Sequence, residues 1–133
     1  EMSVLDFVPY GPPFFELLRG YHAVVAPSIS DEQPRIIFDA AAQAVPVIAS
    51  ATDGLRPHVK SSQTGWLVEV GCPRNLAETI SRLAATPHRL EDCGLRSLAV
   101  AQTLTHREMH RVRSHLLAEM IEDRLDSDQG QAE

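Results

Sequence analysis

The sequence predicts an α/β fold: a Rossmann-like, doubly wound parallel sheet flanked by helices. Short apolar runs of buried-strand type alternate with helical stretches, and this alternation implies parallel strands joined by helical crossovers. The length of 133 residues fits one domain, and 44% of the residues are hydrophobic, enough for a sizeable core. Both faces of such a sheet are expected to be covered by helices.

The N-terminal part predicts two strands with a short helix between them. Residues 4–8 are an apolar run that reads as a strand, and the breaker-rich stretch 9–13 reads as a turn. A short helix is expected over 14–19, with Gly20 as its stop. The apolar run 22–26 then reads as a buried strand.

The middle of the chain continues the alternation. Pro34 sits at a plausible first helical position, and the helix is expected to run to about Ala44. Residues 46–50 read as another buried strand, a short helical turn is expected near 55–59, and residues 65–70 read as a strand.

Three helical stretches close the chain, over 75–85, over 87–102 and from Thr105. Thr105 followed three residues later by Glu108 forms a capping box, which marks the start of the last helix. This helix carries an apolar stripe made of Met109, Val112, Leu116 and Met120. The stripe would be partly exposed if it does not pack within its own domain, and it would then favour self-association of the chain.

The polar stretch 126–133 is expected to be a disordered tail, so the predicted domain covers residues 1–125. Because the chain opens directly into an apolar run, we expect it to be a piece of a longer protein.

Composition excludes several classes of function. The net charge of −6 argues against a nucleic-acid partner, which would need a basic face. No apolar run approaches the length of a membrane span, and the start lacks the features of a signal peptide. The two cysteines, Cys72 and Cys93, belong to no metal-binding pattern, so reduced thiols and a cytoplasmic location are expected.

Ligands of doubly wound sheets bind beyond the carboxyl ends of the strands, which directs attention to the loops 27–33 and 50–54. The first loop leads into a helix whose free N–H groups suit an anion such as a diphosphate. Asp31 in that loop and Asp39 in the helix can accept hydrogen bonds from sugar hydroxyls. This combination suggests a sugar-nucleotide site, although helix caps and solvated charges would explain the same residues.

An ordered set of short motifs gives the chain a family resemblance. It resembles the C-terminal, donor-binding domain of family 4 (group 1) glycosyltransferases of the GT-B fold, over about residues 4–122. The positions that carry the resemblance are Pro27-Ser28, Asp31, Glu32, Gln33, Pro34, Asp39, Ala40–Ala44, Pro46-Val47-Ile48, Asp53-Gly54, Thr64-Gly65 with the strand after it, and Pro73 through Leu76-Ala77.

The resemblance implies a role for each site residue. Asp31 would lie near the reacting carbon of the donor sugar, as the catalytic residue, and Asp39 would hold the ribose hydroxyls. The other donor-binding positions would be Ser28, Glu32, Gln33, Pro34, Asp53 and Gly54, with the backbone amides of Glu32 and Gln33 facing the sugar and the diphosphate.

The family also implies the reaction. A sugar would pass from a nucleotide diphosphate donor to an acceptor glycan, lipid or small molecule with retention of configuration. The acceptor would be held by an N-terminal domain that lies outside this chain, and neither a cofactor nor a metal is expected. The isolated chain is therefore expected to be inactive.

Substitutions around the site leave other functions open. Aspartates, Asp31 and Asp39, stand at the positions of both family glutamates. Three positions that are glycine in the family hold other residues here, namely Glu32, Ala44 and Asp53. The arginine and lysine that hold the diphosphate in the family would precede the chain. A non-catalytic relative kept for binding or assembly, or half of a sugar-nucleotide epimerase, would fit the same fold. The sequence does not name the donor, the nucleotide or the acceptor.

Overall fold

The computed structural model describes residues 2–30, 35–59 and 63–129. By its internal contacts the chain divides into two compact units, residues 1–102 and 103–133. Among the described residues, the first unit contains a sheet and four helices, and the second contains one long helix. The expectation of a single domain over residues 1–125 stays a prediction.

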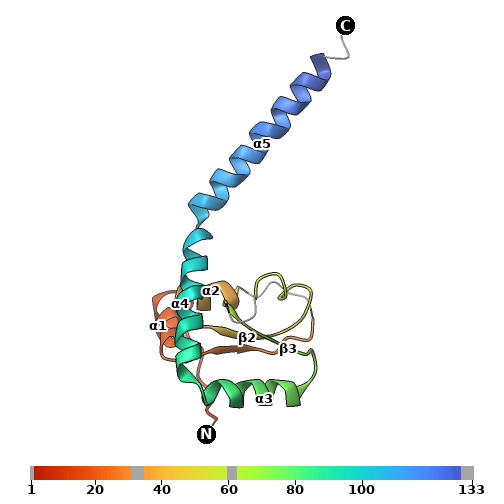
Figure 1. Cartoon of the computed structure of the whole chain (residues 1–133). Helices are drawn as coiled ribbons and strands as arrows, with labels where there is room; N and C mark the ends of the chain where they lie inside the picture. Colours follow the sequence, from red (N-terminus) through yellow and green to blue (C-terminus); the bar gives the residue numbers. More distant parts are fainter. Residues whose placement is uncertain (1, 31–34, 60–62, 130–133) are drawn as a thin grey trace. The chain divides into compact units, whose positions relative to one another are not determined.

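A parallel sheet of three strands forms the centre of the first unit (Figure 1). Strands β1 (Val24–Ala26), β2 (Val47–Ser50) and β3 (Gly65–Val68) lie side by side in that order. In register, Val25 of β1 lies opposite Ile48 of β2, which in turn lies opposite Trp66 of β3. The predicted parallel α/β sheet is therefore confirmed, and each of the three strands falls within its predicted range.

The alternation of side chains along β2 gives the first unit two separate cores. Val47 and Ala49 point to one face and join Ile37 and Ala40 of helix α2 (Ile36–Ala42). The opposite face of β2 contributes Ile48, which joins a second cluster under helices α3 (Pro73–Ala84) and α4 (Pro87–Thr103). That cluster consists of Ile48, Trp66, Val68, Leu83, Leu90 and Cys93. Both faces of the sheet are thus covered, as a buried parallel sheet requires.

The helices match the sequence pattern, with ends that differ by a few residues. Helix α1 covers Pro12–Arg19 and ends at Gly20, as expected, but begins two residues earlier because proline is accepted in the first helical turn. The connection between β2 and β3 contains turns through Leu55 and Val59, where a short helical turn was expected, and the backbone N–H of Val59 donates to the carbonyl of Leu55 at 3.1 Å. Both side chains are fully buried and belong to the same core as α2, so these turns complete that face.

The strand predicted over residues 4–8 is absent from the structure. Residues 2–9 adopt no regular structure, and the side chains of Val4 and Phe7 are 93% and 90% exposed. An apolar run becomes a buried strand only where a neighbouring strand accepts its backbone hydrogen bonds. Within the described residues, the sheet has no strand paired to this segment.

Helix α5 (His106–Gln129) forms the second unit. The backbone N–H of Glu108 donates to the Thr105 hydroxyl at 3.3 Å, which confirms the predicted helix start. The helix continues past Asp126, where a disordered tail was expected to begin. No helix in the described part of the chain is long and apolar enough to cross a membrane.

Candidate functional site

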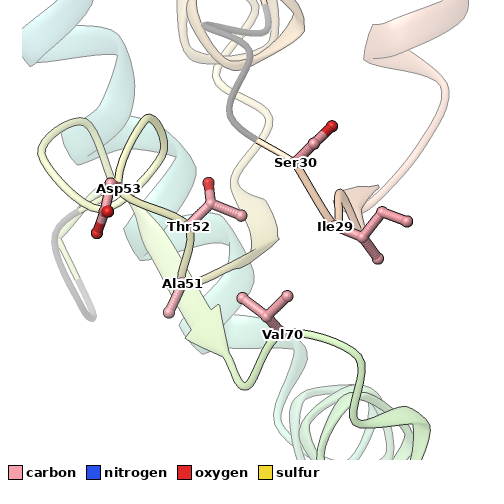
Figure 2. Close-up of a pocket in the computed structure, with 6 residues that line it drawn as sticks. All are labelled: Ile29, Ser30, Ala51, Thr52, Asp53 and Val70. Atoms are coloured by element: carbon pink, nitrogen blue, oxygen red, sulfur yellow. The ribbon is translucent and has the colours of Figure 1, made fainter.

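The carboxyl ends of the three strands border a shallow cavity of about 250 Å³ (Figure 2). Each strand contributes through the loop that follows it. Ile29 and Ser30 come after β1, Ala51, Thr52 and Asp53 come after β2, and Val70 comes after β3. This is the place where the parallel topology predicts a ligand.

A second cavity of about 180 Å³ adjoins the first and shares Ile29 with it. It lies over the start of α3 and is lined mainly by apolar groups, among them Pro27, Val68 and Leu76. Each cavity is smaller than the roughly 300–1,000 Å³ of typical small-molecule sites. Together, however, the two adjoining cavities reach the volume of a small-molecule site.

The loop after β2 owes its shape to Thr52 and Leu55. The backbone N–H of Leu55 donates to the Thr52 hydroxyl at 3.3 Å, and the N–H of Arg56 donates to the Thr52 carbonyl at 2.9 Å. Because Leu55 is fully buried, it anchors the loop to the core. Asp53, between these two residues, is left exposed at the edge of the cavity.

The charges around the cavities are mostly acidic. Among the described residues, the charged side chains in the two linings are Asp53 and Glu69. Figure 2 shows the Asp53 carboxylate pointing away from the side chains of Ile29 and Ser30. The guanidinium of Arg56, which is not in either lining, donates to the carbonyl of Ala51, a residue of the first lining, at 2.8 Å.

The structure brings together some of the residues that the sequence singled out. Asp53 lines the first cavity and Gly54 follows it in the same loop. Ser28 is half-buried, directly before the two residues that the β1 loop contributes. Four predicted residues lie outside the described part of the chain, namely Asp31, Glu32, Gln33 and Pro34.

Asp39, in contrast to Asp53, is not among the residues that line either cavity. It lies in α2, half-buried, where its Oδ1 accepts a hydrogen bond of 2.9 Å from the hydroxyl of Tyr10. This hydrogen bond to Asp39 is the main reason why the pKa of Tyr10 is raised. Partial burial and the negative charge of Asp39 raise it further. A carboxylate already oriented by a phenol has a defined direction in which to accept a further hydrogen bond.

Sequence reasoning did not single out several residues of the site. Ser30 and Thr52 lie in the loops 27–33 and 50–54, to which the strand-end rule directs attention, whereas Val70 lies in the loop after the third strand, where the same rule would have found it. Tyr10 lies 29 residues before its partner Asp39, and no local pattern in the sequence connects the two.

Comparison with known proteins decides the family. The sequence profile described as "Glycosyl transferases group 1" matches residues 1–86, well over half of the chain. The chain belongs to the group 1 glycosyltransferases. This confirms the resemblance seen in the sequence. The cavity at the strand ends is therefore a cavity in a domain of this family.

Two related group 1 glycosyltransferases illustrate the match. A D-inositol 3-phosphate glycosyltransferase from Frankia alni is 36% identical over 93 residues, which are 66% of this chain and 23% of that protein. Another from Thermomonospora curvata is 28% identical over 109 residues, 78% of this chain and 25% of that protein. The chain thus spans about a quarter of the length of these relatives.

Solved structures show the same fold. The Anabaena protein HepE in complex with UDP superposes with a TM-score of 0.72 at 21% identity, over 78% of this chain and 29% of that one. Sucrose-phosphate synthase from Thermosynechococcus elongatus superposes with a TM-score of 0.69 at 27% identity, over 81% and 27% of the two chains. The α/β domain is therefore that of a GT-B glycosyltransferase.

Proposed function

We propose that this chain is the donor-binding part of a retaining glycosyltransferase that moves a sugar from a nucleotide diphosphate to an acceptor. The observation that carries the proposal is the cavity formed by the loops after all three strands in a chain of this family. The HepE structures of the same fold hold UDP, and in one case UDP and glucose. A uridine diphosphate sugar is therefore the first donor to test.

In this proposal the two aspartates Asp39 and Asp31 have different roles. Asp39 accepts hydrogen bonds from the ribose hydroxyls, and Asp31 lies near the reacting carbon of the sugar. The loop from Ser28 to Pro34 and the loop of Asp53 and Gly54 surround the sugar and the diphosphate. Arg56 supplies a positive charge beside the cavity wall. Neither a metal nor another cofactor takes part.

The chain spans about a quarter of the length of its relatives, which supports a division of labour with a second domain. We place the acceptor, a glycan, lipid or small molecule, on an N-terminal domain outside this chain. Orientation of two reactants supplies a large part of the rate, about 7–11 kcal/mol of barrier in favourable cases. The 133-residue chain alone is accordingly expected to bind donor without turnover. Both cysteines are free thiols, which suits a cytoplasmic enzyme.

Isothermal titration calorimetry of UDP and UDP-glucose into the chain tests the donor site. Asp39→Ala should weaken UDP binding about 10- to 150-fold, because hydrogen bonds to a charged group contribute about 1.5–3 kcal/mol. Asp92→Ala, which removes an exposed acid from α4, is the matched control and should leave binding unchanged. Binding that survives Asp39→Ala intact would overturn the ribose assignment.

One observation favours a second candidate, a non-catalytic domain that kept the fold. Within the described residues the charged groups of the cavity linings are both acidic, which opposes an anionic donor. In that case no nucleotide diphosphate sugar would bind even to the longer protein that includes the diphosphate-holding arginine and lysine implied by the family resemblance. The same titration on that longer protein therefore separates the two candidates.

We also propose that the chain self-associates through α5. Its stripe of Met109, Val112, Leu116 and Met120 is exposed. The first half of the helix is mainly basic, with three arginines and one acid, Glu108, which pairs with Arg111, whereas the second half is mainly acidic, with Glu119, Glu122 and Asp123 beside one base, Arg124. An antiparallel pair of α5 helices would cover the stripe and set each basic half beside an acidic half, as a two-fold interface allows.

A further inference from the structure

Tyr10 is fixed in place by three kinds of contact. Its hydroxyl donates to Oδ1 of Asp39 at 2.9 Å. The guanidinium carbon of Arg35, the residue before α2, lies 4.7 Å from the centroid of its ring. Its ring also lies 5.7 Å from that of Phe14 and 5.5 Å from that of Phe15, the second in an edge-on arrangement. These distances are within the range of favourable cation–π and aromatic pairs.

The backbone next to Tyr10 is specialised as well. Gly11 has φ of +124° and ψ of −150°, a conformation almost confined to glycine. This turn carries the chain from the exposed segment 2–9 into α1 while the Tyr10 side chain reaches α2. The turn, the ring contacts and the hydrogen bond therefore all favour one position of the phenol.

We infer that Tyr10 is a positioning residue of the donor site, which orients the Asp39 carboxylate toward the two hydroxyls of a nucleoside ribose. The phenol uses Oδ1 of Asp39, and Oδ2 can accept from the ribose. A carboxylate held by a donor on one oxygen loses little rotational freedom when a ligand binds to the other. This inference rests on the proposed function, because it takes Asp39 as the ribose acceptor.

The segment before α1 thereby acquires a role that its sequence does not suggest. Although Tyr10 is 57% exposed, its ring contacts hold it beside α2, so it is accessible to a ligand and still ordered. The recognition of ribose would then depend on two elements, the turn at Gly11 and the helix α2.

Calorimetry with UDP and with 2′,3′-dideoxy-UDP tests the inference on the 133-residue chain. The dissociation constant of 2′,3′-dideoxy-UDP divided by that of UDP measures how well the ribose hydroxyls are recognised. Tyr10→Phe keeps the ring and removes the hydroxyl, and it should reduce this ratio about two- to tenfold, the range of one hydrogen bond. Tyr21→Phe, which removes the hydroxyl of another exposed tyrosine, should leave the ratio unchanged.

Asp39→Ala should bring the ratio close to one, and adding Tyr10→Phe to that variant should change nothing further. Gly11→Ala retains the hydroxyl but strains the turn, so it should lower the ratio as well. A thermal unfolding midpoint unchanged by Tyr10→Phe would exclude a general loss of folding.

The outcomes separate this inference from the proposed function. If Tyr10→Phe keeps the ratio while Asp39→Ala removes it, Tyr10 does not position Asp39 and the donor site stands. Tighter binding of UDP to Tyr10→Phe would likewise overturn the inference, because the phenol would then compete with the ribose. If UDP does not bind, or Asp39→Ala keeps the ratio, the ribose assignment of Asp39 fails and the role of Tyr10 fails with it.

Discussion

Gly94 of α4 lies directly against the backbone of Ala44, at the end of α2. A Cβ atom on residue 94 would lie 2.1 Å from the carbonyl oxygen of Ala44, well inside any real contact. Ala44 itself has φ of +58°, in the left-handed region that favours glycine. This contact fastens α4 to the turn that leads from α2 into β2.

Gly94→Ala should destabilise the fold by about 2–3 kcal/mol, because the neighbour is a backbone carbonyl that cannot rotate away. Urea unfolding followed by circular dichroism measures the change. Asp92→Ala, an exposed change in the same helix, is the control and should stay within about 0.5 kcal/mol. A variant as stable as the parent chain would show that α4 sits farther from Ala44 than the structure indicates.

Ala44→Gly should stabilise the chain by roughly 0.5 kcal/mol. A left-handed alanine costs about 1–2 kcal/mol, and the added freedom of glycine in the unfolded chain offsets about 0.5–1 kcal/mol of the gain. The same urea titration detects it. Loss of stability would mean that residue 44 does not hold its positive φ in solution.

Ser97→Ala should lower the free energy of unfolding by about 1–2 kcal/mol. The Ser97 hydroxyl is fully buried and donates to the carbonyl of Thr64 at 3.0 Å, just before β3. Its removal takes a donor from a buried carbonyl. Ser81→Ala, at an exposed position of α3, serves as the control in the same thermal or urea experiment. Equal effects of the two changes would argue against this hydrogen bond.

Leu116→Glu should abolish self-association through α5. Leu116 is 53% exposed in the middle of the apolar stripe, and a paired helix would bury a glutamate there without a partner. Sedimentation equilibrium measures the mass. Ala118→Glu adds the same charge on the opposite face of the helix and should leave the mass unchanged. A monomeric parent chain would contradict the proposal directly.

The sequence predicted the fold well where local pattern and tertiary packing agree. The runs that became β1, β2 and β3 are short, apolar and bounded by loops, so the pattern alone identifies them. The proline at the start of α1 and the glycine at its end place that helix within two residues. The strand-end rule also found the correct edge of the sheet for the cavity.

The candidate site was only partly predictable. Asp53 was found because it follows a strand, and it does line the cavity. The partner of Asp39 was not found, because Tyr10 reaches α2 through the turn at Gly11 and not through any periodic pattern. The predicted catalytic Asp31 lies outside the described residues, so its role stays a prediction.

The sequence by itself determined the family and the order of strands and helices, because hydrophobic period, caps and motif spacing are local properties of the chain. Only the tertiary structure decided that residues 4–8 form no strand, since a strand needs a neighbour to accept its hydrogen bonds. It alone decided that Gly94 packs on Ala44 and Tyr10 on Asp39, because contacts between distant segments depend on how the elements pack.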